Sequence, residues 1–411
     1  MKTKAITIII TIMILVVPIV VLPTETNLLK FIALVSVGAI LLVLFLINYK
    51  SIKIDKKDML ILIFAMLIFI STILSSDIHT SIFGAKKRYE GMLSLFSYII
   101  IYLCAKRFFK YKNIKTLLVI LYILFILVGT LGIVQYYIKI PEIKLFSKGV
   151  TGTFGNTNFM GNFLSIGIPV FSMMYILKNK KLSLLTSLIV FFDIVACGAR
   201  SSWLAFATFF IILLAYLIKT KNKEYIKRTG ILLICFVLIF TYLFTAKNSF
   251  TKSKVNAVKS DITVATTQGV TNKMGSSRIQ IWKITVELIK KYPIFGVGTD
   301  NLKKEIMDNL TEESIDFMLR TRKQIDKAHN EYLQYAVTLG IPAMLIYIGF
   351  VLLILKENIK EIENDNAKLI LYLILVSYLV QAFFNISTIG IAPLFWLALG
   401  LADTKEKWLK I

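Results

Sequence analysis

The chain of 411 residues has few cysteines and histidines. It contains three cysteines and two histidines. Cys104, Cys197 and Cys235 fall in or beside long apolar runs, and their spacing fits neither a metal site nor a disulfide framework. No internal repeat is present, so a repeat architecture is not expected.

Long polar stretches are also scarce, because 57% of the residues are hydrophobic and the mean hydropathy is +0.74. About twelve apolar stretches approach the length that a helix needs to cross hydrocarbon. They cover approximately residues 5–22, 28–48, 58–75, 91–105, 114–138, 158–177, 182–199, 202–218, 229–246, 331–355, 367–385 and 389–402. The fourth and last are short, and the count changes if one of them is re-entrant. The pattern predicts an all-α, polytopic membrane bundle with about twelve transmembrane helices.

The first apolar stretch follows Lys2 and Lys4 and resembles the start of a signal peptide. It lacks a small-x-small cleavage site, since Pro18 and Pro23 stand where that site would be. We therefore expect a retained helix. The predicted organisation is then residues 1–246 with helices one to nine, a large loop at 247–330, and residues 331–411 with helices ten to twelve.

The formal net charge of +24 raises the possibility of nucleic-acid binding, but the lysines mostly occupy alternate short loops. No basic, aromatic-interleaved soluble module is present, so no nucleic-acid partner is expected. The basic loops hold Lys50, Lys53, Lys56 and Lys57; Lys106, Arg107, Lys110, Lys112 and Lys115; Lys178, Lys180 and Lys181; Lys219, Lys221, Lys223, Lys227 and Arg228; Lys356, Lys360 and Lys368; and Lys405, Lys407 and Lys410. The positive-inside rule places these loops and both termini in the cytoplasm and the loop at 247–330 outside.

Some basic residues depart from this rule on the outer side. They are Lys86, Lys87 and Arg88, then Lys139, Lys144 and Lys148, and Arg200 in a very short turn. An anionic ligand would explain them, because guanidinium and ammonium groups bind phosphate oxygens. Contact with anionic lipid head groups is the alternative. Asp193 lies on the preceding apolar stretch, where an isolated carboxylate marks a functional site or pairs with a neighbouring basic residue.

The large loop has two parts. Residues 247–275 are rich in Ser, Thr, Lys and Asn without an apolar period, which indicates an irregular arm. A helix is then expected after a cap at Ser276 or Ser277, with an apolar face made by Ile279, Trp282, Val286 and Ile289, before Pro293 and a glycine turn. Arg278 falls in the first turn of that helix, where it can share an anion with the helix amides; a plain surface arginine is the alternative.

His329 ends the loop at the mouth of the tenth apolar stretch, next to Asn330 and Glu331. A histidine can exchange a proton near neutral pH, so it is a candidate general base. A histidine at the start of a helix can equally serve as a cap. The other histidine, His79, has less functional context.

Five segments give the chain a resemblance to a known family. They are SDIHTSIFGAKKRYEG, GTFGNTNFMGNFLS, GARSSWLAF, SSRIQIWKITVELIKKYPIFGVGTDN and AHNEYLQYAVTLGIPA. Their order around one large loop resembles the O-antigen ligase and O-antigen polymerase superfamily of polytopic glycosyltransferases. Arg200, Arg278 and His329 match its recurring Arg, Arg and His, although this chain has ARSSW where members often have a sequence like SRGAW.

The resemblance implies glycosyl transfer at the outer face of a bacterial cytoplasmic membrane. The donor would be an oligosaccharide on polyprenyl diphosphate, and the acceptor a hydroxyl of a glycan or lipid-linked glycan. Arg200 and Arg278 would stabilise the departing diphosphate, and His329 would take the acceptor proton. Arg88, Lys87, Asn158, Asn330, Glu331 and Asp193 are further candidates for substrate binding.

No cofactor is implied, and no acidic cluster suited to magnesium lies in the outer segments, so metal-independent transfer is expected. Displacement on the face opposite the diphosphate would invert the anomeric centre. Two other classes remain open: a twelve-helix transporter or flippase, and a membrane scaffold or glycan-binding protein. The sequence distinguishes neither a ligase from a polymerase nor one sugar from another.

Overall fold

The computed structural model describes residues 2–20, 27–48, 54–110, 113–140, 149–246, 249–272 and 274–404. All the regular secondary structure in these ranges is helical, which confirms the all-α prediction. Pro23, Lys144, Lys148 and several lysines of the predicted cytoplasmic loops and tail lie outside the described residues.

The helices follow the chain as α1 (Lys2–Ile19), α2 (Leu28–Ile47), α3 (Lys56–Ile73), α4 (Ile78–Phe83), α5 (Met92–Phe108), α6 (Ile114–Tyr137), α7 (Thr157–Lys178), α8 (Lys181–Ala196), α9 (Arg200–Thr220), α10 (Lys223–Thr245), α11 (Phe250–Gln268), α12 (Met274–Lys291), α13 (Leu302–Asp308), α14 (Glu312–Thr321), α15 (Glu331–Leu339), α16 (Ile341–Asn358), α17 (Asn366–Ala382) and α18 (Ala392–Ala402).

Six of the described helices are long and apolar enough to cross a membrane, namely α2, α6, α7, α9, α10 and α16. Three shorter apolar helices accompany them: Ala5–Ile19 within α1, α17 and α18. The structure is therefore that of a polytopic helical membrane protein. The total of about twelve spans stays a prediction.

The tenth predicted span is wrong as a single helix. Residues 331–355 form α15 and α16, which meet at Gly340. Gly340 has a φ of 93°, and a Cβ atom there would overlap the carbonyl group of Ile294. The amide of Ile341 donates to the Pro293 carbonyl at 2.8 Å instead of continuing the helix. Close contact with Pro293 and Ile294, within the large loop, therefore breaks a stretch that the sequence presents as one helix.

The expectation of an irregular arm at 247–275 is also wrong, because most of it forms α11. The Ser249 side chain begins this helix by accepting a hydrogen bond from the Lys252 amide at 3.0 Å. Thr251 is its one buried residue. A helix that is exposed on nearly every side needs no apolar period, so the sequence pattern did not reveal it.

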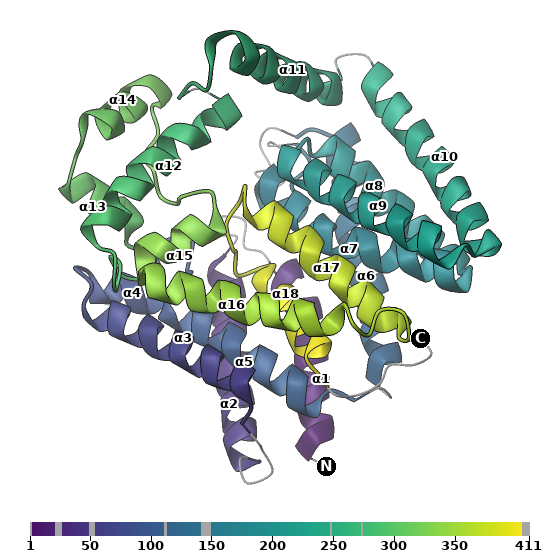
Figure 1. Cartoon of the computed structure of the whole chain (residues 1–411), viewed down its shortest axis with the longest axis horizontal. Helices are drawn as coiled ribbons and strands as arrows, with labels where there is room; N and C mark the ends of the chain where they lie inside the picture. The colour runs from purple at the N-terminus through teal and green to yellow at the C-terminus, as the bar shows by residue number, and fades with distance from the viewer. Residues whose placement is uncertain are drawn as a thin grey trace.

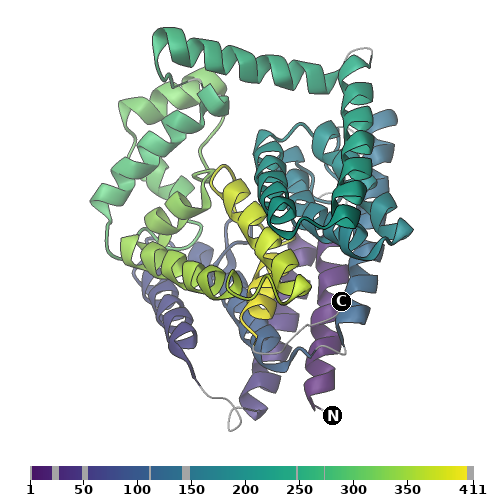
Figure 2. The same cartoon turned by 45° about the vertical axis from the view of Figure 1, so that its right-hand side comes forward.

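The helices of the large loop gather at one end of the bundle (Figure 1). Helix α11 crosses this end from α10 towards α12 and α14, and the turned view shows the same arrangement (Figure 2). The start of α1 lies at the opposite end. Helix α7 is the most enclosed of the six long helices, since its apolar window is entirely buried.

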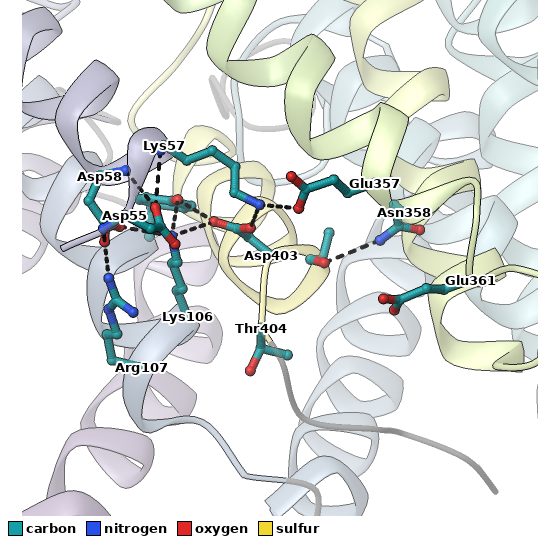
Figure 3. A network of polar contacts seen from close by, with 12 residues as sticks. Asp55, Lys57, Asp58, Lys106, Arg107, Glu357, Asn358, Glu361, Asp403 and Thr404 are labelled. Carbon is teal, nitrogen blue, oxygen red and sulfur yellow. Dashed lines mark hydrogen bonds and ion pairs between the residues drawn. The ribbon is translucent and has the colours of Figure 1, made fainter. Parts of the chain in front are cut away.

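A network of ion pairs joins α3, α5 and α18 at the end where α5 finishes (Figure 3). Its centre is the Lys106 ammonium, which lies 2.7 Å from Asp55, 2.8 Å from Asp58 and 2.7 Å from Asp403. Lys57 also pairs with Asp403. The side chains of Lys106, Asp58 and Asp403 are at most 4% exposed, so each buried charge depends on its partners.

Candidate functional site

His329 lies in the segment that leads into α15, and its backbone has a left-handed φ of 50°. The ring is partly buried, and its Nδ1 atom is buried without a hydrogen-bond partner among the described residues. A buried polar atom without a partner is costly, so it calls for an explanation, and a bound ligand would supply one.

His329 is not the cap of α15. That role belongs to Asn330, whose side-chain oxygen accepts hydrogen bonds from the amides of Tyr332 and Leu333, each at 3.0 Å. The alternative role for His329 was to cap a helix, and Asn330 already has that role in α15. The same contacts engage the side-chain oxygen of Asn330, which the sequence placed among the substrate-binding candidates.

Arg88 reaches the same place from the loop between α4 and α5. Its guanidinium donates from Nε at 2.7 Å and from Nη2 at 2.5 Å to one carboxylate oxygen of Asp326. It also lies over the ring of Phe159, on α7, at 5.5 Å from the centroid. Asp326 is three residues before His329, so the ion pair joins the Arg88 loop to the histidine segment.

Arg278 stands in the first helical turn of α12, as the sequence predicted, because residues 275–277 have left-handed φ angles and precede the regular helix. It makes no ion pair or hydrogen bond within the described part of the chain. Arg200 begins α9 and is near enough to act electrostatically on Arg278. Arg200 itself pairs with Asp261 of α11 at 2.5 Å.

The buried face of α12 is shifted from the predicted one and shares Ile289 with it. Its buried apolar residues are Ile281, Ile284, Leu288 and Ile289, whereas Val286 is 38% exposed. The stripe is shifted because α12 packs on Phe317 of α14 and on α15. Trp282 lies instead edge-to-face against Phe383 after α17, with ring centroids 5.6 Å apart. This packing holds Arg278 at the end of the bundle.

The charges around the imidazole are mostly positive. Burial first, and then the positive charges of Arg278, Arg88 and Lys327, lower the pKa of His329 to about 4 against the opposing effect of Asp326. Burial, and then Arg200, also lower the pKa of Arg278. Burial alone would raise the pKa of Asp326, but Arg88 and the neighbouring cations bring it below its ordinary value. The site is thus a cationic cluster around a neutral histidine.

The remaining candidates lie elsewhere or are already engaged. Glu331 is 2% exposed, and its oxygens accept from the hydroxyls of Tyr347 at 2.9 Å and Tyr378 at 3.0 Å. Lys87 is exposed, and its carbonyl accepts from Asn27 at 2.8 Å. Asn158 is partly buried at the start of α7, where its carbonyl accepts from Asn385 at 3.0 Å.

Asp193 is fully buried on α8, and neither of its carboxylate oxygens has a hydrogen-bond partner in the described residues. It lies against Gly132 of α6, where an added Cβ would be 2.6 Å from both oxygens. No contact joins it to Arg200 or to His329. It is a separate buried carboxylate of the bundle.

Two cavities in the described part of the bundle are lined by none of His329, Arg278 and Arg88. An apolar cavity of about 80 Å³ between α6, α7, α17 and α18 has no charged lining residue and suits hydrocarbon, not phosphate. A polar cavity of about 20 Å³ lies beside Lys327 and Asp300, which is about the space of one water molecule. In the described residues, no group of three or more His, Cys, Asp or Glu side chains is placed to hold a metal ion.

Sequence reasoning missed Asp261, Asp326 and Lys327. Each is a charged residue in a polar segment without periodicity, so spacing gave no reason to select it. Asp326 and Lys327 do stand within three residues of His329, and this proximity was the one available signal.

Together, the fold and these charges define a polytopic helical membrane protein with a cationic, histidine-containing site beside its large helical loop. Residues 185–348 match the family model described as O-antigen ligase. The match includes Arg200, Arg278 and His329. This part of the chain is therefore similar to that family, which confirms the resemblance to the O-antigen ligase and polymerase superfamily.

An uncharacterized protein of Haemophilus influenzae is 28% identical to the chain over 218 residues. These residues cover 50% of this chain and 51% of that protein, so the chain spans about half the length of this relative.

Proposed function

We propose that this protein is a membrane glycosyltransferase that moves a glycan from a polyprenyl-diphosphate donor to a hydroxyl of a glycan or lipid-linked glycan. The family match supports a glycan-processing membrane enzyme. The observation that carries the finer proposal is the His329 imidazole, with an unpartnered Nδ1, among the cations Arg88, Arg278 and Lys327. A general base beside an anion-binding cluster is the pair of devices that transfer from a diphosphate requires.

The reaction balances with these residues. The acceptor oxygen attacks the anomeric carbon while its proton passes to His329. The bond between that carbon and the diphosphate oxygen breaks, and polyprenyl diphosphate leaves with the bonding electrons. Attack on the face opposite the leaving group inverts the anomeric centre.

The arginines would stabilise the charge that develops on the diphosphate. Arg278 is the most available, since it has no carboxylate partner among the described residues, whereas Arg88 and Arg200 pair with Asp326 and Asp261. Arginine can bind two phosphate oxygens at once in a fixed planar geometry. We propose that Arg278, with the paired arginines beside it, takes the role that a divalent cation has elsewhere, so that transfer needs no metal.

Donor binding would also prepare the base. The cations around His329 hold its pKa at about 4 in the empty site. A bound diphosphate would offset their charge, so the imidazole would become a stronger base when the donor is in place. The pKa of a general base is most effective near the working pH.

The arrangement supports an outer location for the site. The loop helices gather at the end of the bundle opposite the start of α1 (Figures 1 and 2). By the positive-inside rule, the basic loops favour cytoplasmic termini. We therefore propose that the site faces outward from the bacterial cytoplasmic membrane and that the donor's lipid tail lies in the bilayer.

The test is a reconstituted assay with the full chain in lipid vesicles and a polyprenyl-diphosphate-linked oligosaccharide. We expect transferred or elongated glycan together with released polyprenyl diphosphate, unchanged by EDTA. Movement of an intact donor between leaflets, without chemical conversion, would indicate a flippase. Donor binding without conversion or movement would indicate a glycan-binding protein.

A further inference from the structure

The short segment at 297–301, which follows α12, connects the two parts of the chain that supply the site. The amides of Val297 and Gly298 donate to the carbonyls of Val337 and Thr338 in α15, at 2.9 and 3.0 Å. A Cβ atom on Gly298 would overlap the side chains near α4, so only glycine fits this close approach. The segment is therefore packed between α15 and the region of α4.

Two polar side chains attach the same segment to α4. The hydroxyl of Thr299 donates to the carbonyl of Ser81. The side-chain amide of Asn301 donates to the Asp77 carbonyl at 3.1 Å and to the Ser81 hydroxyl at 2.9 Å. The helix α4 leads directly into the loop that carries Arg88.

Asp300 is the central residue of this connection. Its side chain is 1% exposed and its backbone has a φ of 62°. One carboxylate oxygen accepts from the amide of Ala85 at 2.7 Å and from the amide of Glu90 at 3.4 Å. The other oxygen lies 2.5 Å from the ammonium of Lys327. The two hydrogen bonds from Ala85 and Glu90 close the loop around Arg88. The ion pair holds Lys327, which stands two positions before His329.

We propose that Asp300 is a positioning residue for glycosyl transfer: its carboxylate holds the Arg88 loop against the His329 segment and neutralises Lys327 beside the imidazole. This inference rests on the proposed function. Asp300 and Lys327 do not contact the substrate in this account, because the cavity beside them is large enough for about one water and not for a sugar ring.

The electrostatic consequence follows from the groups that face the histidine. They are Arg278 from α12, Arg88 from the α4–α5 loop, and Asp326 and Lys327 from its own segment. Lys327 is 3% exposed and is in turn faced by Asp300 and Glu90. Removing the charge of Asp300 leaves Lys327 less compensated and lowers the pKa of His329. Removing the charge of Lys327 raises it.

Three variants separate positioning from general loss of structure: Asp300→Asn, Lys327→Met and the double variant. The double variant removes both members of the ion pair, so neither of them remains as an unpaired buried charge, and it is expected to fold. The titration of His329 can be followed by NMR with labelled histidine in a His79→Gln background, because the chain has only two histidines. His79 is exposed and its ring contacts Phe83.

We expect the pKa of His329 to fall in Asp300→Asn, to rise in Lys327→Met, and to return towards the starting value in the double variant. Each single shift should be about one unit, typical of losing one neighbouring charge. Transfer by Asp300→Asn should fall about tenfold to a hundredfold in kcat, since small misplacements of reacting groups are costly. A pKa that moves in neither single variant, with transfer falling only in step with the amount of folded protein, would overturn the proposal.

The titration needs no substrate, so it is independent of the proposed function. Shifts in opposite directions without transfer in the wild-type protein would sustain the charge coupling and contradict the glycosyltransferase assignment. Transfer in the wild-type protein with an unmoved pKa would sustain the assignment and contradict the role of Asp300.

Discussion

Substitution of Arg278 should affect transfer and stability in different ways. Arg278 is partly buried, it has no carboxylate partner in the described residues, and it lies close enough to Arg200 for the two charges to repel. Its retention therefore opposes folding. Arg278→Ala should remove the repulsion and leave the melting temperature unchanged or raised, while transfer is lost.

The size of the loss follows from the proposed role. Removing one preorganised group that stabilises developing charge costs about a hundred- to a thousandfold in kcat. Arg278→Lys should recover part of this, because an ammonium keeps the charge but loses the two-point geometry. The assay is the release of polyprenyl diphosphate by purified variants, with a thermal melt of each sample.

Lys323→Ala is the matched control, since it removes one exposed positive charge from the same loop. It should retain the wild-type rate. The reasoning fails if Arg278→Ala turns over within about threefold of the wild type, a difference smaller than one tenfold step of 1.4 kcal/mol. It also fails if activity is lost only because the variant melts at a lower temperature.

Ser249→Cys or Thr271→Cys should react with an impermeant thiol reagent in intact cells; labelling only after lysis would reverse the orientation. Asp403→Ala should destabilise the protein by about 3–5 kcal/mol, because it leaves Lys57 and Lys106 with fewer partners in a buried network (Figure 3); an unchanged melt would contradict this. In the free enzyme, His329 becomes protonated as pH drops towards about 4, so kcat/KM should fall there. In the donor complex the bound diphosphate raises the pKa of His329, so kcat should begin to fall at a higher pH. Profiles of kcat and kcat/KM that coincide would contradict an effect of the diphosphate on His329.

The sequence was most informative where a physical pattern is strong. Long apolar stretches specified helices, and an apolar period that begins after Ser277 placed Arg278 in the first turn of α12. The expected serine cap is different, because Ser276 and Ser277 have left-handed φ angles and not the extended backbone of a cap. The position of His329 at the start of a helix was also predictable. The capping role of Asn330 was not, because two neighbouring polar residues are equally able to cap a helix in sequence terms.

The sequence was least informative where tertiary contacts determine the local structure. Hydropathy runs continuously across Gly340, so the break between α15 and α16 depends on the contact with Ile294, although the Gly-Ile-Pro sequence was a local sign. Helix α11 buries almost nothing and so left no apolar pattern. The pairs Arg88–Asp326 and Arg200–Asp261 join residues far apart in the chain, and no spacing rule connects them.

The central claim is that His329 takes the acceptor proton while the arginines bind the donor. The most direct measurement compares His329→Ala with the wild type for both donor binding and transfer in the reconstituted system. The account predicts that binding of the lipid-linked oligosaccharide is kept while transfer falls about a hundred- to ten-thousandfold, the usual effect of losing a positioned base. Near-normal transfer by His329→Ala, or by His329→Asn with a flat pH profile, would contradict it.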